Sequence, residues 1–316
     1  MAGIGLLHNP KAKRNATDPA AAGRLNDVLG NEGVVRYAST REELTAAAEE
    51  FKRVGVEVLA IGGGDGTSHL TITGIIDAYG DTPLPAFGFL RGGTMNTIAN
   101  SFRIPRRPPE ALLASYKRSY AGRGVTPMRF VEPHVMRIAN QYGFIFGTGA
   151  IYGFIAEYNR RDSRDVAWAA KVLATAMGSA AVGGEMIKRV AQRWRGSVRF
   201  DDGSAFPEES YLSIGASTSG QMGLGFRPFY RSGESPQRFH MLGIFASPLQ
   251  FIAGLPNAWL GRTMGAQRTY EKLVERAVLH PSDGVTRYVI DGDVYVHDGP
   301  LEIACGPQIR LVMPDL

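Results

Sequence analysis

The chain has 316 residues, and its 35 Lys and Arg residues exceed its 30 Asp and Glu residues by five. A hydrophobic fraction of 44% excludes a disordered chain, and the length predicts two domains. A net charge of +5 suits an anionic partner such as a nucleotide or an acidic membrane surface. The single Cys305 excludes an intrachain disulfide, and no signal-peptide pattern precedes the first apolar run. We therefore expect a cytoplasmic protein that visits membranes as a peripheral one.

Strands and helices alternate in the first part of the sequence. Thr40 and Glu43 have the spacing of a capping box, which predicts the start of a helix. Short apolar runs predict parallel strands that are buried on both faces. The strands are expected at 5–8, 34–37, 56–61 and 85–90, and the helices at 19–29, 40–54, 68–79 and 95–102. This order predicts an α/β domain with an open parallel sheet over residues 1–128.

The rhythm changes near residue 125. Short strands with turn signals follow a helical stretch at 152–195, which predicts a mainly antiparallel β-sandwich domain with inserted helices over residues 129–316. The strands are expected at 135–139, 143–146, 197–201, 211–215, 239–245, 287–290, 294–297 and 301–304, with the first two paired. A last strand at 309–313 fits either domain. The apolar helical segments 166–184 and 247–260 either wall a pocket for acyl chains or pack on the sandwich.

A glycine-rich loop, Ile61-Gly-Gly-Gly-Asp-Gly-Thr67, follows a buried strand and opens a helix. Ligands of open α/β sheets bind at such strand ends, and a helix start offers free N–H groups to a phosphate. Asp65 places a carboxylate there, which requires Mg²⁺ or a hydroxyl proton between it and the phosphates. The loop lacks the sixth-position glycine of the Rossmann fingerprint and the Gly-Lys-Ser/Thr of the P-loop.

A second glycine-rich loop, Arg91-Gly-Gly-Thr-Met-Asn96, follows the next predicted strand. Loops at neighbouring strand ends are expected to face one crevice, where Thr94 and Asn96 would bond phosphate or ribose oxygens. Taken alone, the second loop is also compatible with an ordinary turn.

Four motifs occur in the order found in the diacylglycerol kinase catalytic family, which includes bacterial lipid kinases, sphingosine kinases and ceramide kinases. They are Asn9-Pro-Lys11, Gly63-Gly-Asp-Gly-Thr67, Gly93-Thr-Met-Asn96 and Asp291-Gly-Asp293. The chain resembles this family over nearly its whole length. The resemblance implies a kinase that uses ATP and Mg²⁺ to phosphorylate a hydroxyl of a lipid such as diacylglycerol or a sphingoid-like lipid.

The resemblance also assigns residue roles. It makes Asp291 the preferred general base, with Asp65 as the rival, and it assigns no metal ligand. The segment Tyr152–Glu157 matches a sphingosine kinase pattern, which places Glu157 at a polar lipid head; an exposed glutamate on a helix surface is the alternative. The implied nucleotide-binding residues are Asn9, Lys11, Gly62, Gly63, Gly64, Asp65, Gly66, Thr67, Gly92, Gly93, Thr94, Asn96 and Asp293.

Two other functions remain open. NAD kinases share Gly-Gly-Asp-Gly-Thr but carry an Asn-Glu pair after it, whereas Asn31-Glu32 precedes the loop here. A non-catalytic nucleotide-binding regulatory protein would keep the fold and lack turnover. The expected partner is a lipid substrate at a membrane surface and not a nucleic acid. The oligomeric state is left open, a homodimer included.

Overall fold

The computed structural model describes residues 3–161, 165–265 and 268–315. The chain divides into two compact units. The first unit is discontinuous in sequence, because it contains the residues up to Pro133 and those from Gln308 onward. The second unit runs from His134 to Pro307. The domain boundary expected after residue 128 therefore moves to Pro133, and the end of the chain belongs to the first unit.

A mostly parallel sheet forms the centre of the first unit, in the order β2-β1-β3-β4-β18-β5. Leu311 pairs in parallel with Phe87 of β4 and antiparallel with Val131 of β5, which is why the last strand and β5 both belong to this unit. The strands are β1 (Ile4–His8), β2 (Gly33–Tyr37), β3 (Val58–Gly62), β4 (Ala86–Phe89), β5 (Phe130–Val131) and β18 (Leu311–Val312).

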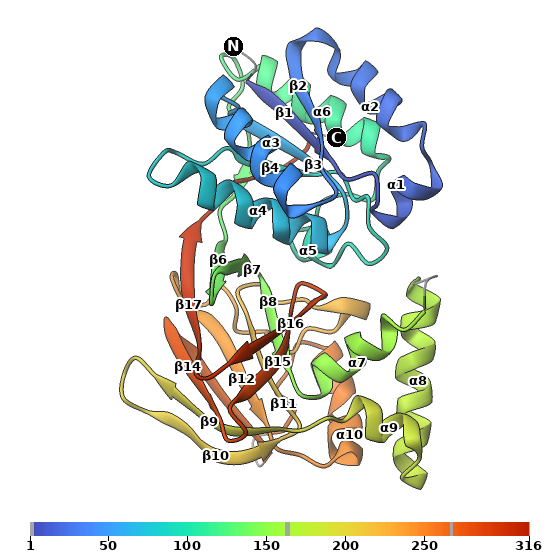
Figure 1. Ribbon diagram of the computed structural model, residues 1–316, viewed down its shortest axis with the longest axis vertical. Helices are drawn as coiled ribbons and strands as arrows, with labels where there is room; N and C mark the ends of the chain where they lie inside the picture. The colour runs from blue at the N-terminus through green and yellow to red at the C-terminus, as the bar shows by residue number, and fades with distance from the viewer. Residues whose placement is uncertain (1–2, 162–164, 266–267, 316) are drawn as a thin grey trace. The chain divides into compact units, whose positions relative to one another are not determined.

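Helices cover both faces of this sheet (Figure 1). The helix α3 packs on α4, and α2 packs on α6. The capping box predicted at the start of α3 is confirmed, because Thr40 accepts from the Glu43 N–H and Glu43 caps the Thr40 N–H. The helices are α1 (Lys13–Thr17), α2 (Ala21–Leu29), the 3₁₀ turn η1 (Gly30–Glu32), α3 (Arg41–Val54), α4 (Asp65–Tyr79), α5 (Thr97–Ser101) and α6 (Pro109–Ala121).

Two antiparallel sheets form the second unit, and their orders are β10-β9-β14-β17-β6-β7 and β13-β12-β11-β8-β15-β16. Side chains from both sheets, including Val198 and Phe146, share one hydrophobic core. The strands are β6 (His134–Ile138), β7 (Gln141–Gly143), β8 (Ile145–Thr148), β9 (Trp194–Phe200), β10 (Ala205–Tyr211), β11 (Ser213–Ser217), β12 (Phe239–Ile244), β13 (Thr269–Val274), β14 (Arg276–Pro281), β15 (Val285–Ile290), β16 (Asp293–Asp298) and β17 (Leu301–Gln308).

The predicted sandwich is confirmed, but two details of its strands were wrong. The strand β6 pairs with β7, whereas β8 belongs to the other sheet. The strand expected at 211–215 is split at Leu212, because β10 ends and β11 begins in a different sheet there. In both places the chain changes sheets within one or two residues, and the residue pattern gives no sign of that change.

Helices lie beside the sandwich in the second unit (Figure 1). They are α7 (Ala150–Tyr158), α8 (Val166–Val182), α9 (Glu185–Val190), α10 (Pro248–Trp259) and the 3₁₀ turn η2 (Gly223–Gly225). Over the described residues, no helix combines the length and the apolar character that crossing a membrane requires.

A half-buried carboxylate links β12 and β13 in the second unit. The hydroxyls of Tyr230 and Thr263 each donate to Glu271 at 2.7 Å, and Nε2 of His240 lies 3.7 Å away. His240 and the two hydroxyl donors lower the pKa of Glu271 from its ordinary 4.5 to about 2. Because the folded-state pKa is lowered, Glu271 stabilises the fold above pH 4.5, and this contribution is lost as the pH falls toward 2.

We therefore predict that Glu271→Gln destabilises the protein at neutral pH and that the difference from wild type shrinks at about pH 2.5. Thermal unfolding at both pH values measures this, with a shift of roughly 2–4 °C for each kcal/mol lost. Glu209→Gln is the matched control, since Glu209 is exposed and its carboxylate makes no hydrogen bond or ion pair with a described residue. An equal deficit of Glu271→Gln at both pH values would contradict the assignment.

Candidate functional site

The two glycine-rich loops of the first unit touch each other through their backbones. They follow β3 and β4, which are parallel neighbours in the sheet. A Cβ atom at Gly93 would lie 2.4 Å from the Cα of Gly64, and one at Gly64 would lie 2.9 Å from the Cα of Gly93. Real Cβ atoms do not approach a backbone this closely, so both positions require glycine. The structure thus brings the two predicted loops together.

Asparagine side chains fix the first loop to the end of β1. The Asn9 amide donates to the Thr67 hydroxyl at 3.0 Å, while Asn9 Oδ1 accepts from the Lys11 N–H at 2.9 Å. The buried Asn15 amide donates to the carbonyls of Asn9 and Gly62, at 2.7 and 2.8 Å. These bonds hold β1, the loop and the first turn of α4 in one arrangement.

The start of α4 is open to an anion. Its N-cap residue, Gly64, has no side chain to bond the first N–H groups of the helix. The amide N–H groups of Gly63 and Gly64 also donate to no acceptor within the described part of the chain. Free N–H groups and the positive end of the helix dipole are the features that bind phosphate at helix starts.

Asp65 joins the first loop to the second. Its Oδ2 accepts from the Thr97 N–H at 2.9 Å and its Oδ1 from the Ile98 N–H at 3.0 Å, so Asp65 caps the start of α5. Burial raises the pKa of Asp65 above its ordinary range, while these two N–H donors act in the opposite direction. The aspartate predicted to act in catalysis thus also positions the second loop.

The second loop is held open by unusual backbone conformations and internal bonds. Arg91 and Asn96 adopt left-handed φ values of 55° and 48°. The Asn96 side chain exchanges hydrogen bonds with Gly93, accepting from its N–H at 3.1 Å and donating to its carbonyl at 2.7 Å. The half-buried Thr94 lies within this closed turn.

Sequence reasoning missed two residues that shape the loops. Asn15 lies in the short helix α1, which was not expected, and no pattern marks it. The buried Arg91 donates to the Ile104 carbonyl and to Asn100 at 2.8 and 2.6 Å. The sequence gives one indication of the role of Arg91, namely that this arginine stands between an apolar strand and two glycines.

Asp291 lies in a tight turn of the second unit. It and Gly292 connect β15 to β16 with φ values of 48° and 100°, the pattern of a type I′ hairpin turn. The buried carboxylate accepts from the Phe144 N–H through both oxygens, at 3.2 and 3.0 Å, and from the Ile145 N–H at 2.9 Å. The turn is therefore bonded to the start of β8 and its carboxylate has a fixed position.

The other predicted residues have distinct settings. The Lys11 side chain is exposed, and the half-buried Asp293 begins β16. Burial raises the pKa of Glu157, but hydrogen bonds from Arg189 and Arg160 outweigh it and leave the pKa below its ordinary range. Glu157 is thus a mostly buried, paired carboxylate and not the exposed helix-surface glutamate of the alternative reading.

The predicted residues belong to different units. Asn9, Lys11 and both glycine-rich loops lie in the first unit, whereas Glu157, Asp291 and Asp293 lie in the second. Within the described ranges, there is no cluster of three or more His, Cys, Asp or Glu side chains that could hold a metal ion. Magnesium bound mainly through nucleotide phosphates needs only one or two protein carboxylates, so Mg²⁺ remains compatible with the carboxylates present.

Comparisons with known proteins agree on the family. Residues 4–121 match the model of the diacylglycerol kinase catalytic domain. The probable lipid kinase YegS of Escherichia coli O17:K52:H18 is 38% identical over 98 residues, which cover 30% of this chain and 31% of that protein. Its counterpart in Shigella flexneri is 36% identical over 101 residues, covering 31% and 32%.

Solved structures extend the likeness to the whole fold. A crystal structure of a diacylglycerol kinase from Bacillus anthracis str. Sterne has a TM-score of 0.65 at 12% identity and covers 99% of this chain and 97% of that one. A second crystal structure from the same strain has a TM-score of 0.71 at 13% identity, with the same coverage. At such identities the likeness describes the fold.

The fold is an α/β unit with a mostly parallel sheet followed by a unit of two antiparallel sheets, as in these solved structures. Residues 4–121 are thus similar to the catalytic domain of diacylglycerol kinases, and the chain spans about a third of the length of the curated relatives that it matches. Both glycine-rich loops, Asn9 and Lys11 lie inside this region.

The contact between the loops predicts a stability effect. We expect Gly93→Ala to destabilise the protein by about 1–3 kcal/mol, because the new methyl group must displace backbone atoms of Gly64. Chemical denaturation measures this. The control is Gly23→Ala, because Gly23 lies in α2 with nothing within 4 Å of its Cβ position. Its expected effect is neutral or stabilising by about 0.5–1 kcal/mol. Equal stability of both variants would contradict the packing described here.

Proposed function

We propose that the protein is a lipid kinase that transfers the γ-phosphoryl group of ATP to a lipid hydroxyl with the help of Mg²⁺. The observation that carries this proposal is the pair of touching glycine-rich loops at the ends of β3 and β4, with the uncapped start of α4 between them. Such a site suits phosphate groups, and it lies within the region that matches the diacylglycerol kinase catalytic domain.

Each part of the first unit has a role in this proposal. The N–H groups of Gly63 and Gly64 and the start of α4 would bind the nucleotide phosphates. The exposed Lys11 would add a positive charge near them. Mg²⁺, when bound, neutralises charge on the phosphates, and Asp65 is the carboxylate of this unit proposed to contact it. Positioning and charge neutralisation supply most of the catalysis in phosphoryl transfer.

Asp291 is the proposed general base. An ordinary aspartate is ionised near neutral pH and can accept a proton from an attacking hydroxyl. The N–H groups of Phe144 and Ile145 fix the Asp291 carboxylate, as general-base catalysis requires of its base. Asp65 remains the rival because its raised pKa makes it a stronger base; like Asp291, it accepts a backbone N–H at each of its oxygens.

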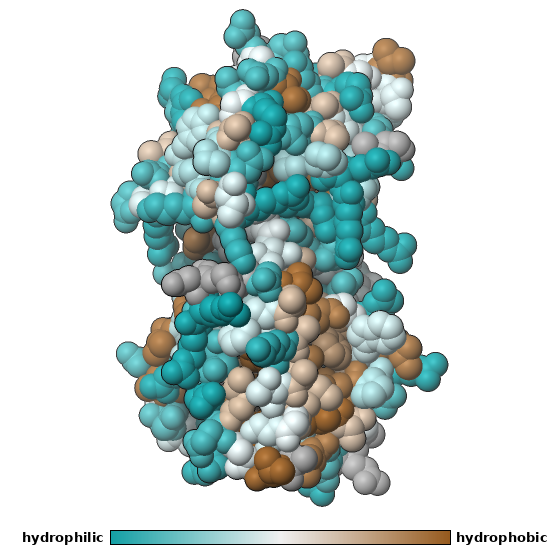
Figure 2. Space-filling view, turned by 90° about the vertical axis from the view of Figure 1, so that its right-hand side faces the viewer, coloured by the Kyte–Doolittle hydropathy of each residue, from teal (hydrophilic) through white to brown (hydrophobic). Residues whose placement is uncertain are grey.

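An exposed apolar surface on the second unit favours a lipid over a soluble acceptor. Figure 2 shows hydrophobic side chains gathered on one face of this unit, on the side where α8 and α10 lie. The sequence of α10 has no charged residue, and α8 has only Lys171. The exposed apolar residues of these helices and their ends are Val166, Met177, Val182, Leu249, Trp259 and Leu260. Contiguous exposed apolar residues are typical of surfaces that contact membranes or other proteins.

One assay tests the proposal directly. The protein is incubated with labelled ATP, Mg²⁺ and separate acceptors, namely diacylglycerol, sphingosine, ceramide, phosphatidylglycerol and NAD. A labelled lipid identifies the acceptor. Labelled NAD phosphate would replace the proposal with the NAD kinase alternative. ATP binding without any labelled product would favour the non-catalytic nucleotide-binding protein.

We predict that Asp291→Asn lowers turnover by about 10²–10⁴-fold and leaves ATP affinity nearly unchanged. Asparagine tolerates the left-handed backbone of this position, so the turn should persist. Steady-state kinetics and calorimetry with ATP measure the two effects. Asp298→Asn, at the exposed far end of β16, is the charge-matched control and should keep full activity.

Asp65→Asn separates the two candidate bases. Because Asp65 also caps α5, its replacement should weaken ATP binding as well as turnover. If Asp291→Asn stays active while Asp65→Asn binds ATP without turnover, Asp65 is the base. Near-normal activity of both variants would exclude this mechanism.

A further inference from the structure

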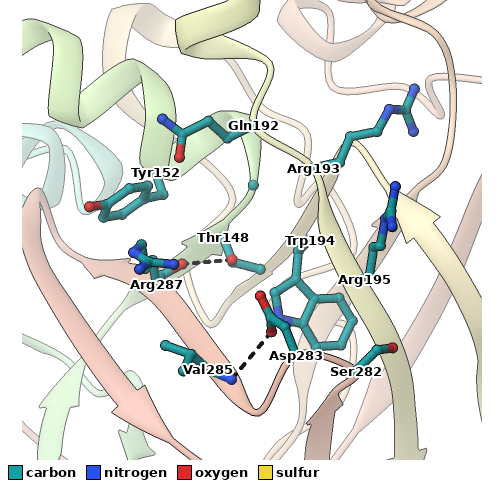
Figure 3. A pocket seen from close by; sticks show the side chains of 11 residues that line it. Thr148, Tyr152, Gln192, Arg193, Trp194, Arg195, Ser282, Asp283, Val285 and Arg287 are labelled. Carbon is teal, nitrogen blue, oxygen red and sulfur yellow. Dashed lines mark hydrogen bonds between the residues drawn. The ribbon is translucent and has the colours of Figure 1, made fainter.

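A pocket of about 520 Å³ lies within the second unit. Of the candidate functional residues described above, only Tyr152, at the start of the segment Tyr152–Glu157, lines it. Figure 3 shows Tyr152 and Arg287 on one side, Trp194 and Arg195 on the other, and Asp283 between them. The walls come from α7, the first residues of β9 and the connection between β14 and β15. A volume of this size suits a small ligand.

The pocket carries uncompensated positive charge. Neither the Arg195 nor the Arg287 guanidinium makes a hydrogen bond or ion pair with a described residue. Arg193 is committed differently, because it donates to the carbonyls of Ser210 and Ala246 at 2.6 and 2.8 Å. The one acidic lining residue, Asp283, accepts from the Val285 N–H at 3.2 Å. Three arginines and one aspartate leave two positive charges on the lining.

The pocket is separate from the proposed catalytic aspartate. Asp291 follows the last residue of β15, whereas Val285 and Arg287 of the pocket lie at or near its first residue. The neighbouring β8 shows the same separation, since Ile145 bonds Asp291 and Thr148 lines the pocket. Arg287 precedes Asp291 by four residues of extended chain, which corresponds to about 13 Å.

The chemistry of the lining selects a class of ligand. Guanidinium groups bind phosphate through paired N–H donors, and a phosphate monoester carries close to the two negative charges that the lining would neutralise. Tyr152 offers a ring surface for a short carbon chain, and Gln192 adds polar atoms. We propose that this pocket is a second binding site, which takes a phosphate ester attracted by the positive charges of Arg195 and Arg287 on its two sides.

Two sources could supply that group, a soluble phosphate ester or the headgroup of an anionic phospholipid. Both present the same phosphate chemistry to the arginines, and they differ in whether a membrane must be present. The inference concerns binding only and holds whether or not the protein proves to be a lipid kinase.

The experiment measures binding with two probes. Calorimetry follows sn-glycerol 3-phosphate, with glycerol as the uncharged control. Co-sedimentation follows vesicles of phosphatidylcholine with and without phosphatidylglycerol at one fixed salt concentration. The proteins are wild type, Arg195→Gln, Arg287→Gln, the double variant and Arg199→Gln. Arg199 is the matched control, because it is an exposed arginine four residues further along β9 and outside the pocket.

We expect each pocket substitution to weaken binding about tenfold or more, because each removes a charge-assisted contact to phosphate. Arg199→Gln should bind like wild type. Loss of glycerol 3-phosphate binding in the pocket variants supports a soluble ligand. The same loss seen only with phosphatidylglycerol vesicles supports a lipid headgroup. If neither probe binds wild type, or if the double variant binds as well as Arg199→Gln, the proposal is wrong. Circular dichroism of each variant confirms that it is folded.

Discussion

The contact between two glycine backbones is the constraint on which the first unit depends. Gly64 and Gly93 can approach each other only without side chains, and their approach places the start of α4 beside the second loop. Asp65 then uses the same proximity to cap α5 with both carboxylate oxygens. The same backbone contact therefore packs the two loops together and shapes the proposed phosphate site. A substitution at Gly64 or Gly93 is expected to change both the packing and the site.

Much of this unit could be predicted because its signals are local. The capping box of α3 depends on two residues three positions apart, and the glycine loops follow continuous apolar strands. The role of Asp65 as a cap for α5 could not be predicted, since its partners, Thr97 and Ile98, lie more than thirty residues away. For the same reason, Asn15 gave no sequence signal, because its importance comes from the Gly62 carbonyl it reaches.

The second unit was harder to predict in detail. The chain passes from one sheet to the other at Leu212 and between β7 and β8, and no turn signal in the sequence marks either place. The motif at Asp291-Gly292 could be interpreted as a hairpin turn or as the position of a functional carboxylate. The structure shows the hairpin turn that these residues favour. The turn also holds a carboxylate in a fixed position through the N–H groups of Phe144 and Ile145. The Asp-Gly sequence between two predicted strands indicates the turn. The N–H groups of Phe144 and Ile145 can be identified as donors only from the folded backbone.

The position of β18 has a consequence for the order in which the protein is completed. Leu311 pairs with both β4 and β5, so this strand fills the gap between them, although the whole second unit precedes it in the chain. During synthesis, β4 therefore presents an unpaired edge until the sandwich has been made. A chain that stops before Leu311 would leave that edge open to other strands, which is a recognised route to aggregation. The strand β18 thus completes a sheet whose first strand, β1, lies near the start of the chain.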